Sequence, residues 1–124
     1  MYNFIQHFRD YLRLREAVNT ADEHHAKDGD RYYVMPSLDG KLVIMDRKNF
    51  RLLKRKHYIS QDVTLNQLRS ECFYHTPYAN GTDRMPAIVR KERAEKYYEW
   101  ITTWRKAEKM RKKDAKRNKK GAKG

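Results

Sequence analysis

The sequence predicts an α+β fold with a long N-terminal helix, a β-hairpin, two short helices and a long C-terminal helix running into a basic tail. Two observations predict it. Apolar residues near both ends of the chain recur at steps of three and four, the period of a helix with one buried face. Two aromatic and β-branched runs in the middle flank an Asp-Gly pair, which is typical of a hairpin. We expect the 124 residues to form one small domain at 1–104 and a solvated tail at 105–124.

The first helix is predicted over residues 3–25, with Asn3 as its N-cap and Gly29 just past its end. Its apolar side chains follow steps of 4, 3, 3, 4 and 3, which places them on one face. We expect this face to be buried; it consists of Phe4, Phe8, Tyr11, Leu14, Val18 and Ala21.

The hairpin is predicted next, with strands at residues 31–35 and 41–45. Between them, Asp39-Gly40 can adopt the positive φ values of a tight turn. Two strands alone bury little apolar surface, so one face of the hairpin must pack on a helix. The first helix is the nearest candidate.

Two short helices follow in the prediction. The first spans residues 47–57, with Asp46 as N-cap and with Phe50 and Leu53 facing the core. The second begins at residue 62 or 63 and ends near residue 74. Thr64 and Gln67 have the spacing of a capping box near its start.

A loop is predicted over residues 75–85, because Pro77 and Asn80-Gly81 are turn signals. The last helix is predicted from Pro86, since proline suits a first helical turn. Its expected buried face consists of Ala94, Tyr97, Ile101, Trp104, Ala107 and Met110. No large apolar side chain follows Met110, so nothing beyond it would hold a helix against a core.

Residues 105–124 carry most of the positive charge of the protein. They contain eleven Lys or Arg and two acids, and eleven minus two gives +9 of the total +13. Such a segment buries too little apolar surface to offset its ordering entropy, and its like charges repel. It is suited to lying along a polyanion, above all a nucleic-acid backbone. The alternative is an end that only keeps the chain in solution.

The predicted helix at 47–57 is a second basic cluster. Arg47, Arg51 and Arg55 lie at i, i+4 and i+8, so a helix projects all three guanidinium groups from one face. Lys48, Lys54 and Lys56 widen this surface. A helix of this kind can sit across phosphates, although an ordinary solvated face has the same composition.

Both clusters together predict a non-catalytic nucleic-acid-binding protein, for DNA or RNA. The residues predicted to contact nucleic acid are Arg47, Lys48, Arg51, Lys54, Arg55, Lys56, Arg105, Lys106, Lys109, Arg111, Lys112, Lys113, Lys116, Arg117, Lys119 and Lys120. The alternative is a phage or mobile-element assembly or adaptor protein whose basic tail binds an acidic protein partner. We expect no membrane partner and no small-molecule substrate.

Aromatic side chains also lie among the polar and basic residues of 74–84. Tyr74 and Tyr78 could stack on unpaired bases, as aromatic platforms do in single-strand binders. They could equally seal the edge of a small core. The sequence leaves both interpretations open.

Neither an enzyme nor a metal site is predicted. The chain has no G-x-S-x-G, no H-E-x-x-H and no glycine-rich phosphate loop. Cys72 and His75 have C-x-x-H spacing, but the adjacent His24 and His25 would point in different directions on a helix. We therefore expect no cofactor.

The compartment is predicted to be the cytoplasm. Cys72 is the single cysteine, which fits a reducing environment, and the first ten residues lack the basic and apolar regions of a secretory signal. No apolar run exceeds four residues, which is far short of a membrane span.

Residues 31–58, from Arg31-Tyr32-Tyr33-Val34-Met35-Pro36 through Gly40-Lys41-Leu42-Val43-Ile44-Met45-Asp46-Arg47, resemble a segment of small uncharacterised basic proteins of gut-bacterial mobile elements. Those of tailless single-stranded DNA phages are the most similar. The resemblance implies a setting, in a phage or the cytoplasm of its bacterial host with DNA nearby. It implies no mechanism and transfers no functional residue.

Overall fold

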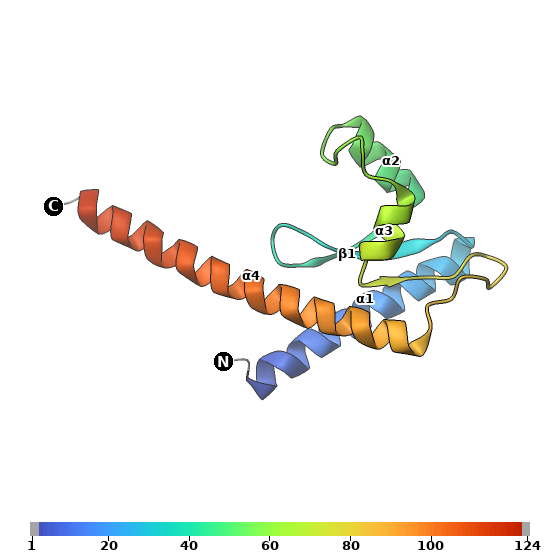
Figure 1. Ribbon diagram of the computed structural model, residues 1–124, viewed down its shortest axis with the longest axis horizontal. Helices are drawn as coiled ribbons and strands as arrows, with labels where there is room; N and C mark the ends of the chain where they lie inside the picture. Colours follow the sequence, from blue (N-terminus) through green and yellow to red (C-terminus); the bar gives the residue numbers. More distant parts are fainter. Residues whose placement is uncertain (1–2, 123–124) are drawn as a thin grey trace.

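The computed structural model describes the backbone of residues 3–122 and the side chains of residues 3–118. Its elements, in chain order, are α1 (Phe4–Asp28), β1 (Tyr32–Pro36), β2 (Leu42–Asp46), α2 (Arg47–Arg55), α3 (Leu65–Glu71), β3 (Tyr74–His75) and α4 (Ala87–Ala122). The predicted α+β fold is confirmed (Figure 1). None of the described helices has the length and hydrophobicity that crossing a bilayer requires.

The sheet separates two layers of helices. Its strand order is β2-β1-β3 and both pairings are antiparallel, so β1 is the central strand. Side chains alternate along β1, as the pleat requires. Tyr32 and Val34 belong to the core shared with α1 and α4, whereas Tyr33 packs with Phe50 of α2 and Leu68 of α3. In Figure 1, α2 and α3 lie on one side of the sheet and α1 and α4 on the other.

α1 has the predicted caps but a shorter buried face than predicted. The side chain of Asn3 accepts from the backbone N–H of Gln6 (2.8 Å), and Gly29 ends the helix at φ 74°. The buried side chains begin only at Asp10 and continue as Leu14, Ala17, Val18 and Ala21. Phe4 and Phe8 are 81% and 52% exposed, and Tyr11 is exposed as well, so their predicted burial is wrong. The core formed with the sheet and α4 does not include these first turns of α1.

The hairpin lies one residue later than predicted, with Gly40 at φ 81° in its loop. Asp46 caps α2 as predicted, accepting from the backbone N–H of Asn49 (2.7 Å), but α2 ends at Arg55 rather than at residue 57. The capping box of α3 is confirmed for Thr64 and Gln67.

The predicted end of α3 near residue 74 is wrong, because the chain leaves the helix at Cys72 to add a third strand. The backbone N–H of Phe73 donates to Val34 (2.9 Å), and that of Thr76 donates to Tyr32 (3.0 Å). Tyr74 and His75 thereby pair with β1. A two-residue strand has no periodicity of its own, so the sequence carries no signal for it.

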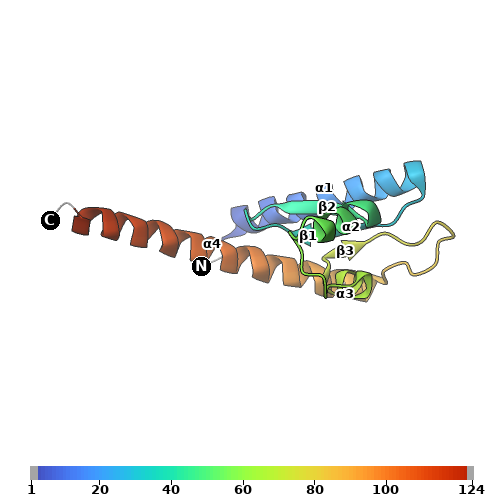
Figure 2. The same cartoon turned by 90° about the horizontal axis from the view of Figure 1, so that it is seen from above.

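α4 begins at Ala87, directly after Pro86, and its buried side chains are Tyr97 and Ile101. Trp104 is partly buried, and its Nε1 donates to the carbonyl oxygen of Leu38 in the hairpin loop (3.1 Å). The predicted stripe ends here, since Ala107 and Met110 are exposed. The predicted tail continues α4 as a helix, and both views show it projecting beyond the rest of the molecule (Figures 1 and 2).

Candidate nucleic-acid interface

The basic cluster of α2 is held on the surface by one aromatic side chain. Phe50 is 3% exposed in the core between α2, α3 and β1, whereas Arg47, Arg51 and Arg55 are exposed. Lys48 and Lys56 are exposed too. Lys54 differs, because it is half-buried with Nζ 5.6 Å from the centre of the Phe50 ring. Its stem therefore covers the core instead of extending the arginine face.

A groove of about 590 Å³ lies between α2, α3, the start of β1 and the loop after β3, and we call it the α2–α3 groove. Three of its cations come from α2: Arg47, Lys48 and Arg51. Arg31 and Arg69 supply two more, against the acids Asp30 and Asp46. Five minus two gives a lining charge of +3. Lys54, Arg55 and Lys56 do not line it.

Arg31 is the least exposed cation of the α2–α3 groove. Its side chain is 8% exposed and forms an ion pair with Asp83. Nε donates to the carbonyl oxygen of Thr76 (3.1 Å), and Nη2 donates to Nδ1 of His75 (2.9 Å). Because a guanidinium only donates, Nδ1 of His75 must be the unprotonated acceptor. These contacts tie β1 to the segment after β3.

His75 is therefore neutral at its contact with Arg31. It is 4% exposed, and burial lowers its pKa; the nearby positive charge of Arg31 acts in the same direction. The carbonyl oxygen of Thr76, 3.2 Å from Nδ1, raises the pKa of His75, but burial has the larger effect and the pKa is lowered overall.

Asp83 joins two of the cations of the groove. Nε and Nη2 of Arg69 each donate to one of its carboxylate oxygens (2.6 Å), and Arg31 donates as well. The hydrogen bonds from Arg69, followed by those from Arg31, hold the pKa of Asp83 far below its usual range. When Asp83 is counted with the two lining acids, five cations and three acids leave a net charge of +2.

The two tyrosines of the predicted stacking segment have different surroundings. Tyr74 is 7% exposed and its hydroxyl donates to Asp22 (2.6 Å), so it belongs to the core. Tyr78 is 52% exposed and lines the α2–α3 groove. Cζ of Arg31 lies 4.2 Å from the centre of its ring, which holds one face of the ring in place.

The second predicted cluster lies on the part of α4 from residue 105 to 122, which we call the α4 extension. Lys106, Lys109, Lys113 and Lys116 are exposed at steps of 3, 4 and 3, so they share one face. Lys112 and Arg117 are exposed as well, whereas the exposed Arg111 pairs with Glu108. The side chains of Lys119 and Lys120 lie outside the described residues.

Arg105 differs from the other cations of the α4 extension. Both Nη atoms donate to the carboxylate of Asp10 in α1, which is 0% exposed; the Nη1 bond is 2.8 Å long. The first residue of the predicted tail therefore binds α4 to the body of the protein.

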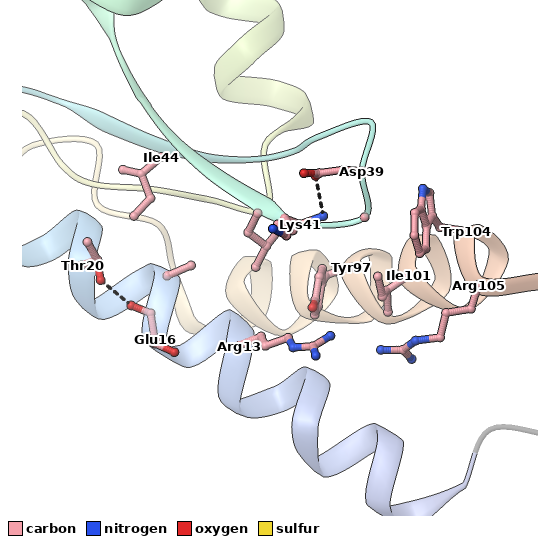
Figure 3. Close-up of a pocket in the computed structure, with 13 residues that line it drawn as sticks. Arg13, Glu16, Thr20, Asp39, Lys41, Ile44, Tyr97, Ile101, Trp104 and Arg105 are labelled. Carbon is pink, nitrogen blue, oxygen red and sulfur yellow. Dashed lines mark hydrogen bonds between the residues drawn. The ribbon is translucent and has the colours of Figure 1, made fainter. Parts of the chain in front are cut away.

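A second pocket, of about 530 Å³, lies between α1, the hairpin and α4 (Figure 3). Its cations are Arg13, Lys41 and Arg105, and its acids are Glu16 and Asp39. When Asp10, the ion-pair partner of Arg105, is included, the pocket has three cations and three acids and therefore no net charge. This balance makes it a poorer anion site than the α2–α3 groove.

Sequence reasoning missed Arg31, Arg69 and Asp83, which lie far apart in the chain and meet only in the fold. It also had no means of placing Tyr78 beside the cations of α2. No protein-family model, curated protein or solved structure matches the chain.

Proposed function

We propose that the protein is a non-catalytic nucleic-acid-binding protein that contacts phosphate through the α4 extension and through α2. If the chain is phage-encoded, as the resemblance of residues 31–58 implies, its setting is the cytoplasm of the bacterial host. The proposal covers DNA and RNA alike, because phosphate contacts position a protein on either polymer without reading its sequence.

One observation carries the proposal: cations are exposed in quantity on two surfaces that the core holds apart. On the α4 extension, Lys106, Lys109, Lys113 and Lys116 share one helix face. On α2, Arg47, Lys48 and Arg51 line a groove with an excess of positive charge. Two such surfaces favour an extended polyanion, since a small anion would engage only one of them.

The proposal is tested by titrating the protein with mixed-sequence and homopolymer oligonucleotides at several salt concentrations. If about 6–8 phosphates are neutralised, the logarithm of the affinity falls against the logarithm of the salt concentration with a slope of about −4 to −7. We expect little dependence on sequence.

A matched pair of triple variants separates the α4 extension from general surface charge. Changing Lys109, Lys113 and Lys116 to Gln should reduce the slope by about 2–3, since each neutralised phosphate contributes ~0.7–0.9. The control changes Lys41, Lys91 and Lys96, which are exposed lysines outside both surfaces, and should leave the slope nearly unchanged. Changing Arg47 and Arg51 to Gln should weaken binding by a smaller amount that does not depend on sequence.

The adaptor alternative has an observation of its own. Phe4, Ile5 and Phe8 are exposed on the first turns of α1, and exposed apolar groups of this kind mark contacts between proteins. If the wild-type protein binds no oligonucleotide at low salt, the proposal of nucleic-acid binding is rejected. Binding of an acidic protein partner is then the better explanation of the basic surfaces.

A further inference from the structure

We infer that the α2–α3 groove binds an unpaired nucleotide, with its base stacked on Tyr78 and its phosphate held by the cations of α2, so that the preferred ligand is single-stranded. This inference rests on the proposed function and names the kind of nucleic acid that this part of the protein binds.

The first support is the position of Tyr78. Its ring is half exposed, yet it lines the groove together with Arg47, Lys48 and Arg51. A volume of about 590 Å³ falls in the range of pockets for small ligands, so a nucleotide fits. Base and phosphate of one nucleotide could therefore be contacted from the same groove.

The second support is the fixed position of the Tyr78 ring. Arg31 lies over one ring face, and three partners in turn hold Arg31: Thr76, His75 and Asp83. No other ring or cation contact to Tyr78 occurs among residues 3–118. A ring whose position is fixed in the free protein loses little entropy when a base stacks on it.

The third support concerns the form of the ligand. In a duplex both faces of a base are covered by its neighbours, so only an unpaired base can offer a face to an aromatic side chain. Stacking tolerates any base because every base has a π-face. The groove therefore favours a single strand without favouring a sequence.

The test measures the affinity of the full chain for four probes of equal length: a mixed-sequence single strand as DNA, the same strand as RNA, its DNA duplex, and an abasic strand. Tyr78→Ala should weaken binding to a single strand by between about 5-fold and 150-fold, the usual effect of removing a stacking ring. The duplex and abasic probes should bind this variant and the wild type alike. Tyr78→Phe keeps the ring and should retain wild-type affinity.

Tyr58→Ala is the matched control, because Tyr58 is 76% exposed and lies outside the groove. It should leave every affinity unchanged. If Tyr78→Ala weakens the abasic and base-containing strands equally, the substitution acts through Arg31 and the stacking inference is overturned.

Two other outcomes also overturn it. In the first, Tyr78→Ala binds the single strand as tightly as the wild type and with the same salt dependence. This result leaves the proposed function unaffected. The other is a free mononucleotide binding as tightly as the strand, which makes the groove a nucleotide site. Absence of any binding by the wild type removes the proposed function itself and is thus distinguishable from both.

Discussion

The carboxylate of Asp10 is the least expected buried group of the protein, and Arg105 accounts for it. The residue is 0% exposed on α1, and both Nη atoms of Arg105 on α4 donate to it. Removing one partner of a buried ion pair is far more costly than replacing both, because the remaining charge stays in a low-dielectric site. We therefore expect the pair to specify how α1 meets α4 more than it adds net stability.

We expect Arg105→Gln to lower the free energy of unfolding by about 3–5 kcal/mol, measured by urea denaturation. The double variant Asp10→Leu/Arg105→Met should recover most of this loss, since two apolar side chains replace both charges. Lys106→Gln, on the neighbouring exposed residue, should change stability by under ~0.5 kcal/mol. Equal losses in the single and double variants would contradict this account.

His75 should make the protein less stable in mild acid. Burial lowers the pKa of His75 in the folded protein. Its contribution to the free energy of unfolding is therefore fully present above the unfolded pKa of about 6.5, and it is lost as pH falls below that value and through the folded-state pKa. Protonation also places a cation against Arg31, and the contact from Nη2 to Nδ1 is broken. Asp83 has the same sign, but its effect begins only as pH falls towards the ordinary carboxyl pKa of about 3.8, below the range in which His75 acts.

The thermal midpoint should accordingly fall between about pH 7 and pH 5. In His75→Asn, Oδ1 can accept from Arg31 without titrating, so we expect a flatter pH dependence of the midpoint. His57→Asn is the control, because His57 is exposed at φ 63°, a conformation that Asn tolerates. A His75→Asn profile parallel to the wild type would show that another group causes the acid sensitivity.

At the scale of elements, the α4 extension is the least supported helix. The side chains of residues 111–118 are all exposed and pack on no core, and the lysines at i, i+3 and i+4 repel one another. A polyanion that neutralises this face should therefore increase its helicity. We expect inorganic polyphosphate to deepen the helical far-UV circular dichroism of the full chain.

The same titration on a chain ending at Met110 should show no gain, because the charged turns have been removed. A gain of equal size in the shortened chain would place the anion elsewhere, for instance in the α2–α3 groove. Since polyphosphate has no bases, the outcome does not depend on stacking at Tyr78.

Local patterns predicted the elements whose signal lies within a few residues. The caps at Asn3, Asp46 and Thr64 and the positive φ of Gly40 are of this kind, whereas Asp39 has no positive φ. Periodicity alone overestimated burial in α1, since a stripe shows which face is apolar but not how far its partner reaches. The strand β3 was missed for a related reason, because its two residues become a strand only through pairing with β1.

The charge pattern of the sequence indicates the basic parts of the candidate interface but not how the whole fold assembles them. The α2 cluster is continuous in the chain and was therefore visible. The groove also needs Arg31, Arg69 and Tyr78, which come from the residue before β1, from α3 and from the loop after β3. Only the three-stranded sheet, with α2 and α3 on one side, brings them together (Figure 1).

The boundary between the body and the α4 extension is best tested with two shortened chains. A chain ending at Met110 loses eight Lys or Arg and one acid, which lowers the net charge by seven, but it keeps Arg105 on Asp10. Its thermal midpoint should stay within a few degrees of the wild type, since the side chains of residues 111–118 are exposed and belong to neither core cluster. Its affinity for oligonucleotides should depend much less on salt.

A chain ending at Trp104 is only six residues shorter but lacks Arg105, so the Asp10 carboxylate loses its guanidinium partner. We expect it to be destabilised by about 3–5 kcal/mol, close to the loss for Arg105→Gln in the full chain. If both shortened chains melt like the wild type, the ion pair does not attach α4 to α1. If both unfold, the extension is part of the folded body, and the salt dependence of the shortened chains cannot be assigned to the lost lysines. Only a stable chain ending at Met110 beside an unstable one ending at Trp104 places the boundary between Arg105 and Met110, later than the charge pattern predicts.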